Sequence, residues 1–319
     1  MKNEIHTAVI GAGMIGLSMC LLLTGNGIKT KLYVRRNSSE KKRLYHQMME
    51  DLKDQKLLSF EEYKRCSSYL QVVTSYEELQ DIEVAFECVS EELGVKQKIY
   101  KELTRNCPLL KVIASTTSAI PSEELARQSE APEKIIVAHP FYPPHLIPCV
   151  EVVPNSYTSK ETEDILISLL EYLNRKPVLL KKDANGFIAN RIQYAMLREA
   201  VHIVEQGIAE PEDVDKVLMY SFAPRYTSIG IFEHFDNCGL DLAEKIAKEL
   251  YPDLSRETEP QEMIRRHCQK GEYGVKTAKG IYDWSEGNIC RLQSRIRTPY
   301  LKYFSWKIPE KECNWEDIE

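Results

Sequence analysis

The sequence lacks the features that mark membrane, fibrous and disulfide-stabilised proteins. No stretch approaches the roughly 18 consecutive apolar residues that a membrane span needs. Glycine (14) and proline (15) make up about a tenth of the 319 residues, too few for a collagen-like or low-complexity chain. The nine cysteines are scattered and form no CxxC pair, which argues against a disulfide framework and predicts no metal site.

Positive charge is not in excess either. The chain carries 42 Lys and Arg against 48 Asp and Glu, a formal net charge of −6. This balance argues against bulk nucleic-acid binding, but it allows a local basic pocket for an anionic ligand. Only six residues precede the first apolar run, at Thr7, and that run leads straight into glycines, so we expect no secretory leader. With cysteines typical of reduced thiols, this predicts a cytoplasmic protein.

Short β-rich runs alternate with amphipathic stretches of helical length over residues 1–182, a pattern typical of a parallel α/β sheet. The charged segment 39–66, with its spaced leucines and methionines, predicts helices at the edge of this sheet. Eight runs are candidate strands: 7–10, 31–34, 69–73, 84–89, 112–114, 135–138, 150–153 and 178–180.

Beyond Asp183 the β-rich runs disappear, and apolar residues recur at helical spacing over 186–206. Further helices are expected at 210–220, where Pro211 suits the first turn, and at 240–250. We therefore expect an α/β fold with a Rossmann-type, doubly wound, mainly parallel sheet over residues 1–182 and an all-helical C-terminal domain over residues 183–319. The last 25 or so residues, with Trp306 and Trp315, predict only a surface arm or tail.

A glycine motif follows the first strand directly and opens an apolar helix at 17–23. Gly11 permits a tight turn, Gly13 lets the backbone approach a pyrophosphate, and Gly16 allows close helix–sheet packing. Met14 and Ile15 lie within this motif and are further candidate cofactor-binding residues, and the N-terminal N–H groups of the helix attract phosphates. A lone GxGxxG is a weak signal, but the preceding strand and the following helix are the context that a dinucleotide fold requires. The domain over 1–182 is therefore expected to bind NAD or NADP.

The second strand lacks the acidic residue that usually binds the ribose of NAD. Val34 stands there, eighteen residues after Gly16, and Arg35 and Arg36 follow it. Their guanidinium groups can bind a 2′-phosphate by charge-assisted hydrogen bonds, which favours NADP over NAD. The alternative is that both arginines are solvated at a loop tip.

Four further segments carry polar residues suited to catalysis. Ser118 ends a Ser/Thr cluster after a strand, His139 opens a proline-rich loop, Glu151 lies in an apolar strand, and Asn190 lies near the start of the helical domain. Each has a structural alternative when taken alone: a turn or helix cap, a structural histidine, or a half-exposed edge residue. Their combination favours a catalytic site.

With these motifs, the chain resembles the 3-hydroxyacyl-CoA dehydrogenase family, which includes L-gulonate 3-dehydrogenase (lambda-crystallin) and carnitine dehydrogenase relatives. The resemblance runs from Ala8 to Trp284. It implies an NAD(P)-dependent oxidoreductase that transfers a hydride between a small-molecule substrate, a 3-hydroxyacyl-CoA or small 3-hydroxy acid, and the nicotinamide, as in fatty acid metabolism. Its markers are the glycine motif, 87–91 with Lys96, 115–118, 139–141, Glu151, 186–187 with 190–191, and 276–284.

The resemblance also implies a role for each matching residue. His139 is the general acid/base, and Glu151 orients its ring and stabilises its cation. Ser118 and Asn190 hydrogen-bond the reacting oxygen and position substrate and nicotinamide. Two further residues, Glu91 and Lys96, match positions near the cofactor. A homodimer formed by the helical domain is expected, because the apolar content of 188–204 and 214–222 exceeds what covering a sheet edge requires.

Several readings stay open. Tyr142 stands where most relatives carry Asn after the histidine, so the substrate is a 3-hydroxyacyl-CoA or, alternatively, L-gulonate or carnitine. A dinucleotide-binding structural or redox-sensing protein is the non-enzymatic alternative, but such a protein has no chemical need for the polar set around His139. A lysine-dependent β-hydroxyacid dehydrogenase is disfavoured, because Lys181 and Lys182 end a strand before the helical domain.

Overall fold

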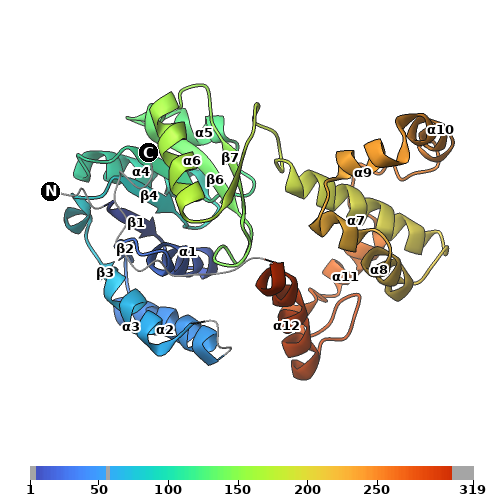
Figure 1. The fold of residues 1–319 in the computed structure, drawn as a ribbon, viewed down its shortest axis with the longest axis horizontal. Helices are drawn as coiled ribbons and strands as arrows, with labels where there is room; N and C mark the ends of the chain where they lie inside the picture. The colour runs from blue at the N-terminus through green and yellow to red at the C-terminus, as the bar shows by residue number, and fades with distance from the viewer. Residues whose placement is uncertain (1–4, 55–57, 304–319) are drawn as a thin grey trace. The chain divides into compact units, whose positions relative to one another are not determined.

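The computed structural model describes residues 5–54 and 58–303. They divide into two compact units: residues up to Ile188 together with those from Arg297 on, and Ala189–Ile296 (Figure 1). The division follows Ile188, whereas the sequence placed a domain boundary after residue 182; the roles of the two domains stay predictions. Trp306 and Trp315 of the expected tail lie outside the described residues. No helix in the described ranges is long and apolar enough to cross a membrane.

The first unit is built on one eight-stranded sheet with the order β3-β2-β1-β4-β5-β6-β7-β8. All eight candidate strands are present, and the expected doubly wound, mainly parallel sheet is confirmed. Only β7 pairs antiparallel, with β6, while β8 runs parallel to β7. The strands are β1 (Thr7–Ile10), β2 (Thr30–Tyr33), β3 (Leu70–Val73), β4 (Val84–Glu87), β5 (Val112–Ser115), β6 (Ile135–Pro140), β7 (Cys149–Val153) and β8 (Lys176–Leu179).

Helices cover both faces of this sheet (Figure 1). One face packs against α1 (Met14–Gly25), α2 (Ser38–Asp54), α3 (Phe60–Tyr69) and α6 (Lys160–Tyr172). The other packs against α4 (Leu93–Asn106), α5 (Ser122–Ala126) and the short η1 (Tyr76–Leu79), and a second short helix, η2 (Pro132–Lys134), leads into β6. Successive strand side chains point to opposite faces, so Val9 joins the first apolar cluster and Ala8 and Ile10 the second. Helices α2 and α3 confirm the helical segment predicted between the second and third strands.

The second unit is helical, as expected. Its first helix begins after Gly186 and Phe187, whose positive φ angles of 75° and 51° exclude them from a right-handed helix. Pro211 is the first residue of α8, in agreement with the prediction. The helices are α7 (Ala189–Glu205), α8 (Pro211–Tyr220), η3 (Ala223–Thr227), α9 (Ile231–Cys238), α10 (Leu240–Leu250), α11 (Glu262–Gln269), η4 (Val275–Thr277) and α12 (Glu286–Tyr303), the last continuing past Ile296.

Few side chains of the second unit are buried. Within 189–296, all of which the structure describes, only Val201 and Ser255 are buried. Large apolar side chains face solvent instead, among them Tyr220 at 81% exposure and Phe232 at 84%. The unit therefore buries little apolar surface of its own, unlike the first unit with its two apolar clusters.

Candidate active site

The candidate site lies at the carboxyl ends of the parallel strands. Strand β1 lies between β2 and β4, so the strand order reverses at this point, and ligands of open α/β sheets bind outside such a switch point. The glycine motif follows β1, Glu87 ends β4, Ser115 ends β5 and His139 lies near the end of β6. The fold therefore gathers segments far apart in the sequence at one edge.

The three glycines of the motif differ in what surrounds them. Gly11 has a φ of 107°, and a Cβ there would lie 2.7 Å from the carbonyl oxygen of Cys88. A Cβ on Gly16 would lie 2.0 Å from the carbonyl oxygen of Gly11, so both positions exclude any side chain. Gly13 has no protein atom within 4 Å of an added Cβ and leaves open space where α1 begins. This open approach to a helix N-terminus fits a pyrophosphate. Met14 at this turn is 71% exposed, and Ile15 is half-buried.

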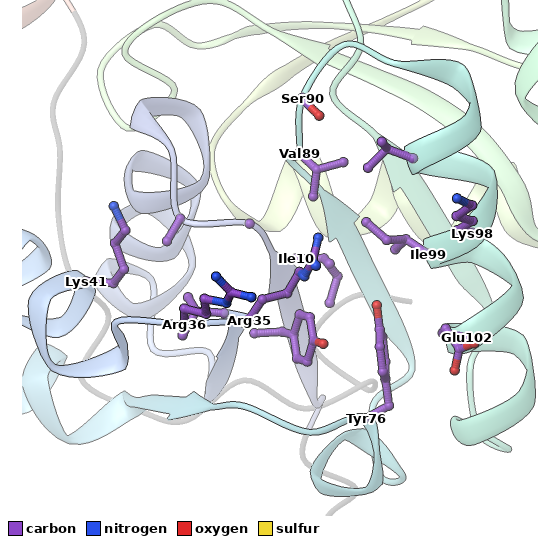
Figure 2. A pocket seen from close by; sticks show the side chains of 15 residues that line it. Ile10, Arg35, Arg36, Lys41, Tyr76, Val89, Ser90, Lys98, Ile99 and Glu102 are labelled. Atoms are coloured by element: carbon purple, nitrogen blue, oxygen red, sulfur yellow. The ribbon is translucent and has the colours of Figure 1, made fainter.

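A pocket of about 630 Å³ lies beside the glycine motif (Figure 2). Val34 lines it and is buried, while Arg35 and Arg36 line it with exposed side chains. The stacked rings of Tyr33 and Tyr76, 4.4 Å apart, also line it. Figure 2 shows the arginines and Lys41 on one side and α4 on the other. The lining residues are Ile10, Gly11, Ala12, Tyr33, Val34, Arg35, Arg36, Lys41, Tyr76, Val89, Ser90, Val95, Lys98, Ile99 and Glu102.

Two lysines of this pocket, Lys41 and Lys98, were not indicated by the sequence. Lys41 lies in the first turn of α2, six residues after Arg35, and its position after the second strand was the available signal. Lys98 lies on α4, whose charged residues gave no indication of the face that lines the pocket. The pocket thus combines four basic side chains with one acidic residue, Glu102.

A buried ion pair lies at the end of β4. Glu87 is fully buried, and its carboxylate accepts hydrogen bonds from Lys96 Nζ at 2.8 and 3.0 Å. Tyr100 OH at 2.9 Å, Ser115 Oγ at 2.7 Å and the Val89 amide at 2.9 Å also donate to it. Lys96 itself is only 1% exposed. The structure therefore places its ammonium group inside the protein, between carboxylates, rather than on the surface.

The second carboxylate bound by Lys96 is that of Glu91, at 3.2 Å. Oε1 of Glu91 accepts the backbone amides of Ser118 at 2.9 Å and Ala119 at 3.1 Å, and also the hydroxyl of Thr117. Burial raises the pKa of Glu91, but the Thr117 hydroxyl, the charge of Lys96 and the Ser118 amide outweigh it and hold this pKa below its ordinary value. The predicted cofactor-binding residues Glu91 and Lys96 thus form one network with the predicted catalytic residue Ser118. The Ser118 side chain is exposed.

His139 and Glu151 form a buried pair. They lie directly opposite each other in the antiparallel β6–β7 register, where facing side chains meet. Nδ1 of His139 donates to Oε2 of Glu151 at 2.8 Å, and Oε1 of Glu151 accepts the Ile188 amide at 2.8 Å. The rings of Phe141 and Phe187 flank the imidazole at centroid distances of 5.0 and 5.3 Å. A carboxylate on Nδ1 fixes the tautomer of the neutral ring and leaves Nε2 as its hydrogen-bond acceptor.

The loop that joins β6 to β7 is fixed by two residues that the sequence did not indicate. Ser18 Oγ on α1 lies 2.6 Å from Nδ1 of the buried His145. Arg175, also buried, donates to the carbonyl oxygens of Pro144 at 3.1 Å and Ile147 at 3.3 Å. The only available sequence signal was the position of Ser18, two residues after Gly16. These contacts link the glycine-motif helix to the loop between His139 and Glu151.

Asn190 belongs to the second unit, as the second residue of α7, and its side chain is half-buried. Along the chain it follows Ile188, which holds Glu151, by two residues. The structure therefore brings together Glu91, Lys96 and Ser118 in one network and His139 and Glu151 in another. The catalytic and cofactor-binding roles of these residues stay predictions. Lys181 and Lys182 are exposed at the end of β8.

Comparison with known proteins gives matches over most of the chain. Residues 6–184 match the 3-hydroxyacyl-CoA dehydrogenase NAD binding domain, and residues 186–284 match the 3-hydroxyacyl-CoA dehydrogenase C-terminal domain. The 5-formyl-3-hydroxy-2-methylpyridine 4-carboxylate 5-dehydrogenase of Mesorhizobium japonicum is 28% identical over 294 residues, 91% of this chain and 94% of that protein. Lambda-crystallin of Oryctolagus cuniculus is 33% identical over 235 residues, 70% of this chain and 72% of that protein.

A solved structure shares the fold along nearly the whole chain. The crystal structure of a 5-formyl-3-hydroxy-2-methylpyridine 4-carboxylic acid 5-dehydrogenase, described as an NAD+ dependent dismutase, has a TM-score of 0.82 at 23% identity. The match covers 94% of this chain and 97% of that chain. With the two family domains matched in order and the glycine motif after β1, the chain belongs to the 3-hydroxyacyl-CoA dehydrogenase family and is an NAD-dependent oxidoreductase.

Proposed function

We propose that this protein interconverts a 3-hydroxyl and a 3-keto group next to an acyl function, with His139 as acid/base and Glu151 as its partner. The observation that carries the proposal is the buried hydrogen bond of 2.8 Å between Nδ1 of His139 and Glu151. The bound dinucleotide supplies a nicotinamide ring that accepts or donates the hydride. The chain's own residues then have to move one proton and hold the reacting oxygen.

In the oxidation direction, Nε2 of His139 takes the proton of the substrate hydroxyl. Glu151 stabilises the resulting imidazolium by its charge, and the Ile188 amide keeps the other carboxylate oxygen in place. Ser118 and Asn190 hydrogen-bond the reacting oxygen and position substrate and nicotinamide. Glu91 and Lys96 stand near the cofactor, with Lys96 acting through Glu91 because its ammonium group is buried.

His139→Ala and Glu151→Gln test the pair. Each should lower turnover by ~10²–10⁴-fold, because the first removes the base and the second removes the charge that stabilises its cation. Dinucleotide affinity, measured by titration of NADH fluorescence, should stay nearly unchanged. His6→Ala is the matched control: His6 pairs with Asp81 through Nδ1 at the same 2.8 Å, just before β1 and β4 begin and so at the opposite end of these strands from the candidate site. Turnover near that of the wild type in either variant would contradict the assignment.

The proposed substrate is a 3-hydroxyacyl-CoA or a small 3-hydroxy acid, and a CoA thioester would place the protein in fatty acid metabolism. The family and the His139 environment support this class, and lambda-crystallin and L-carnitine dehydrogenase among the relatives make L-gulonate and carnitine the alternatives. Tyr142, 51% exposed beside Phe141, adds a ring to the loop after His139. A substrate panel should show activity first with L-3-hydroxybutyryl-CoA, then with L-gulonate and carnitine. Activity with 2-hydroxy acids or simple alcohols only would refute the class.

Beyond NAD, we propose that the protein accepts NADP(H) and prefers it. The buried Val34 replaces the carboxylate that would repel a 2′-phosphate, and Arg35, Arg36 and Lys41 line the same pocket. A well-formed charge-assisted bond contributes about 1.5–3 kcal/mol, which corresponds to a preference of one to two orders of magnitude.

Measuring kcat/KM with both dinucleotides decides this question. Val34→Asp/Arg35→Ala should reverse the preference towards NAD, whereas Arg127→Ala should leave it unchanged, because Arg127 pairs with Glu124 on the surface away from the pocket. A wild-type preference for NAD that survives the loss of Arg35 would refute the proposal.

We also propose that residues 1–182 bind the dinucleotide and that residues 183–319 bind substrate and form a homodimer. The support is the small buried fraction of 189–296 and its exposed Tyr220 and Phe232, a surface that a second copy would cover. Light scattering at micromolar concentration should give about twice the subunit mass of 36.8 kDa. A mass of one subunit would contradict the dimer.

A cytoplasmic location is proposed on the state of the thiols. Cys20, Cys66, Cys88 and Cys107 are free and buried, and burial raises the pKa of Cys66 to about 12. Such thiols act as small apolar side chains, as in reducing compartments. Cell fractionation that recovered the protein outside the cytoplasm would contradict this proposal.

A further inference from the structure

We propose that Glu87 is a positioning residue for the active site: it holds Lys96, and through Lys96 and Glu91 it fixes the backbone at Ser118. No role of its own was predicted for Glu87 from the sequence, and its carboxylate is fully buried. This inference rests on the proposed role of Ser118 in binding the reacting oxygen. Three successive contacts join Glu87 to Ser118.

The first contact is the hub at Glu87. Its carboxylate accepts donors from three separate elements: Lys96 and Tyr100 of α4, Ser115 at the end of β5, and the Val89 amide of the loop after β4. Its backbone oxygen accepts the amide of Thr116 at 2.9 Å and the Thr116 hydroxyl at 3.0 Å. One residue therefore fastens the ends of β4 and β5 and the first half of α4.

The second contact passes the constraint to Glu91. Lys96 is 1% exposed, and its Nζ lies 2.8 Å from Glu87 and 3.2 Å from Oε2 of Glu91. The Glu91 side chain is 39% exposed, so it could turn into solvent if it were not held. Lys96 has no such freedom, because Glu87 binds it with both carboxylate oxygens. The ammonium group thus acts as a fixed point for the Glu91 carboxylate.

The third contact is the turn after β5. While Oε2 of Glu91 faces Lys96, its Oε1 accepts the amides of Ser118 and Ala119 and the Thr117 hydroxyl. A carboxylate held at one oxygen presents the other at a fixed angle, so the amide of Ser118 takes a defined place. The backbone that carries the exposed Ser118 hydroxyl is therefore anchored to Glu87 through Glu91 and Lys96.

Energetic considerations support a positioning role over a purely stabilising one. Removing an ion pair from water costs about as much as the pair's attraction returns, so apolar residues of similar volume often stabilise a core equally well. Glu87 and Lys96 nevertheless meet with every carboxylate oxygen hydrogen-bonded. Hydrogen bonds are directional, so such a fully satisfied network fixes the orientation of its side chains. Apolar contacts are not directional and would fix that orientation less tightly.

The test uses Glu87→Gln, Glu91→Gln and the double variant of the full-length protein. If Glu87 acts through Glu91, each single variant should lower kcat/KM by ~10–100-fold. The kcat/KM of the double variant should then be no more than ~3-fold lower than that of the less active single variant. Tyr45→Phe is the control, because it removes a buried hydroxyl hydrogen-bonded to Thr24, outside the network. Multiplicative losses in the double variant, or an unchanged kcat/KM in Glu87→Gln, would overturn the proposal.

Amide hydrogen exchange gives a readout that does not depend on turnover. Glu87→Gln should raise the exchange rate of the Ser118 and Ala119 amides at least ~10-fold, and Tyr45→Phe should leave it unchanged. Unchanged exchange in Glu87→Gln would overturn the positioning role. If Glu87→Gln does not fold, Glu87→Gln/Lys96→Met removes both charges and should show the same faster exchange. Wild-type turnover in Ser118→Ala would refute the proposed role of the Ser118 hydroxyl. Faster exchange in Glu87→Gln would still show that the Glu87 network holds the Ser118 backbone.

Discussion

His145 should make the stability of this protein depend on pH, and replacing it by Asn should remove that dependence. Its backbone amide donates a hydrogen bond of 3.4 Å to Ser18 Oγ, and the same oxygen lies 2.6 Å from Nδ1 of the ring. Burial, followed by the positive charges of Arg297 and Arg175, lowers the pKa of His145 from 6.5 to about 3, so the ring is neutral in the folded protein at pH 7.

The sign and size of the effect follow from this lowered pKa. Above pH 6.5 the ring is neutral in both folded and unfolded chains, so the contribution to stability is fully present. As the pH falls below 6.5 the unfolded chain takes up a proton that the folded protein refuses, and the contribution is lost progressively down to about pH 3. Between pH 7 and pH 5 the loss amounts to roughly 2 kcal/mol for this one site.

Urea unfolding at pH 7 and pH 5 measures this loss. The wild type should lose roughly 2 kcal/mol more free energy of unfolding between these pH values than His145→Asn, whose side-chain amide can still hydrogen-bond to Ser18 without titrating. Ser18→Ala is the informative control: it removes the hydroxyl but keeps a buried imidazole, so it should lower stability at pH 7 and retain the wild-type pH dependence. Equal pH dependence in the wild type and His145→Asn would refute the reasoning.

Two further predictions concern the glycine motif and the buried ion pair. Gly13→Ala should leave thermal stability nearly unchanged, because its Cβ enters space free of protein atoms. The same Cβ would occupy the space proposed for the pyrophosphate, so dinucleotide binding in a fluorescence titration should weaken at least ~10-fold. Gly16→Ala should instead destabilise the fold, because its Cβ would lie 2.0 Å from the Gly11 carbonyl oxygen. Equal effects of both substitutions on stability would contradict this distinction. Lys96→Met should cost about 3–5 kcal/mol of unfolding free energy in urea, because it leaves the Glu87 carboxylate buried without a cation, and a loss below about 1 kcal/mol would show that the pair is not tightly coupled.

The sheet was predictable from the sequence because its strands are short apolar runs separated by helical segments. Runs such as 84–89 and 135–138 belong to strands buried on both faces, and their continuous apolar character identifies them without tertiary information. The glycine motif was equally predictable, because Gly11 and Gly16 are required by local packing between β1, α1 and the loop after β4. The pairing of His139 with Glu151 came from the family resemblance, and the antiparallel register then explains it.

Hydrogen-bond partners far apart in the chain were not predictable in the same way. Ser18 and His145 are 127 residues apart, and neither residue type carries a local signal for a buried contact. Lys96 was expected near the cofactor as a charged residue, yet it is 1% exposed, because Glu87 compensates its charge. A single sequence shows which residues can ionise, whereas burial of an ionised group depends on a partner that only the fold supplies.

The two networks and the loop contacts show that the first unit holds the polar groups of the candidate site in fixed positions. The His139–Glu151 pair, the Ile188 amide that binds it and the network from Glu87 to Ser118 all lie within the first unit, and each carboxylate accepts two or more hydrogen bonds. Organised donors and acceptors need no rearrangement when charge develops during a reaction, which is the condition for electrostatic catalysis. The second unit, with only two buried residues within 189–296, has no comparable internal support. The proposed homodimer would cover its exposed apolar side chains, which is the physical reason to expect association through that unit.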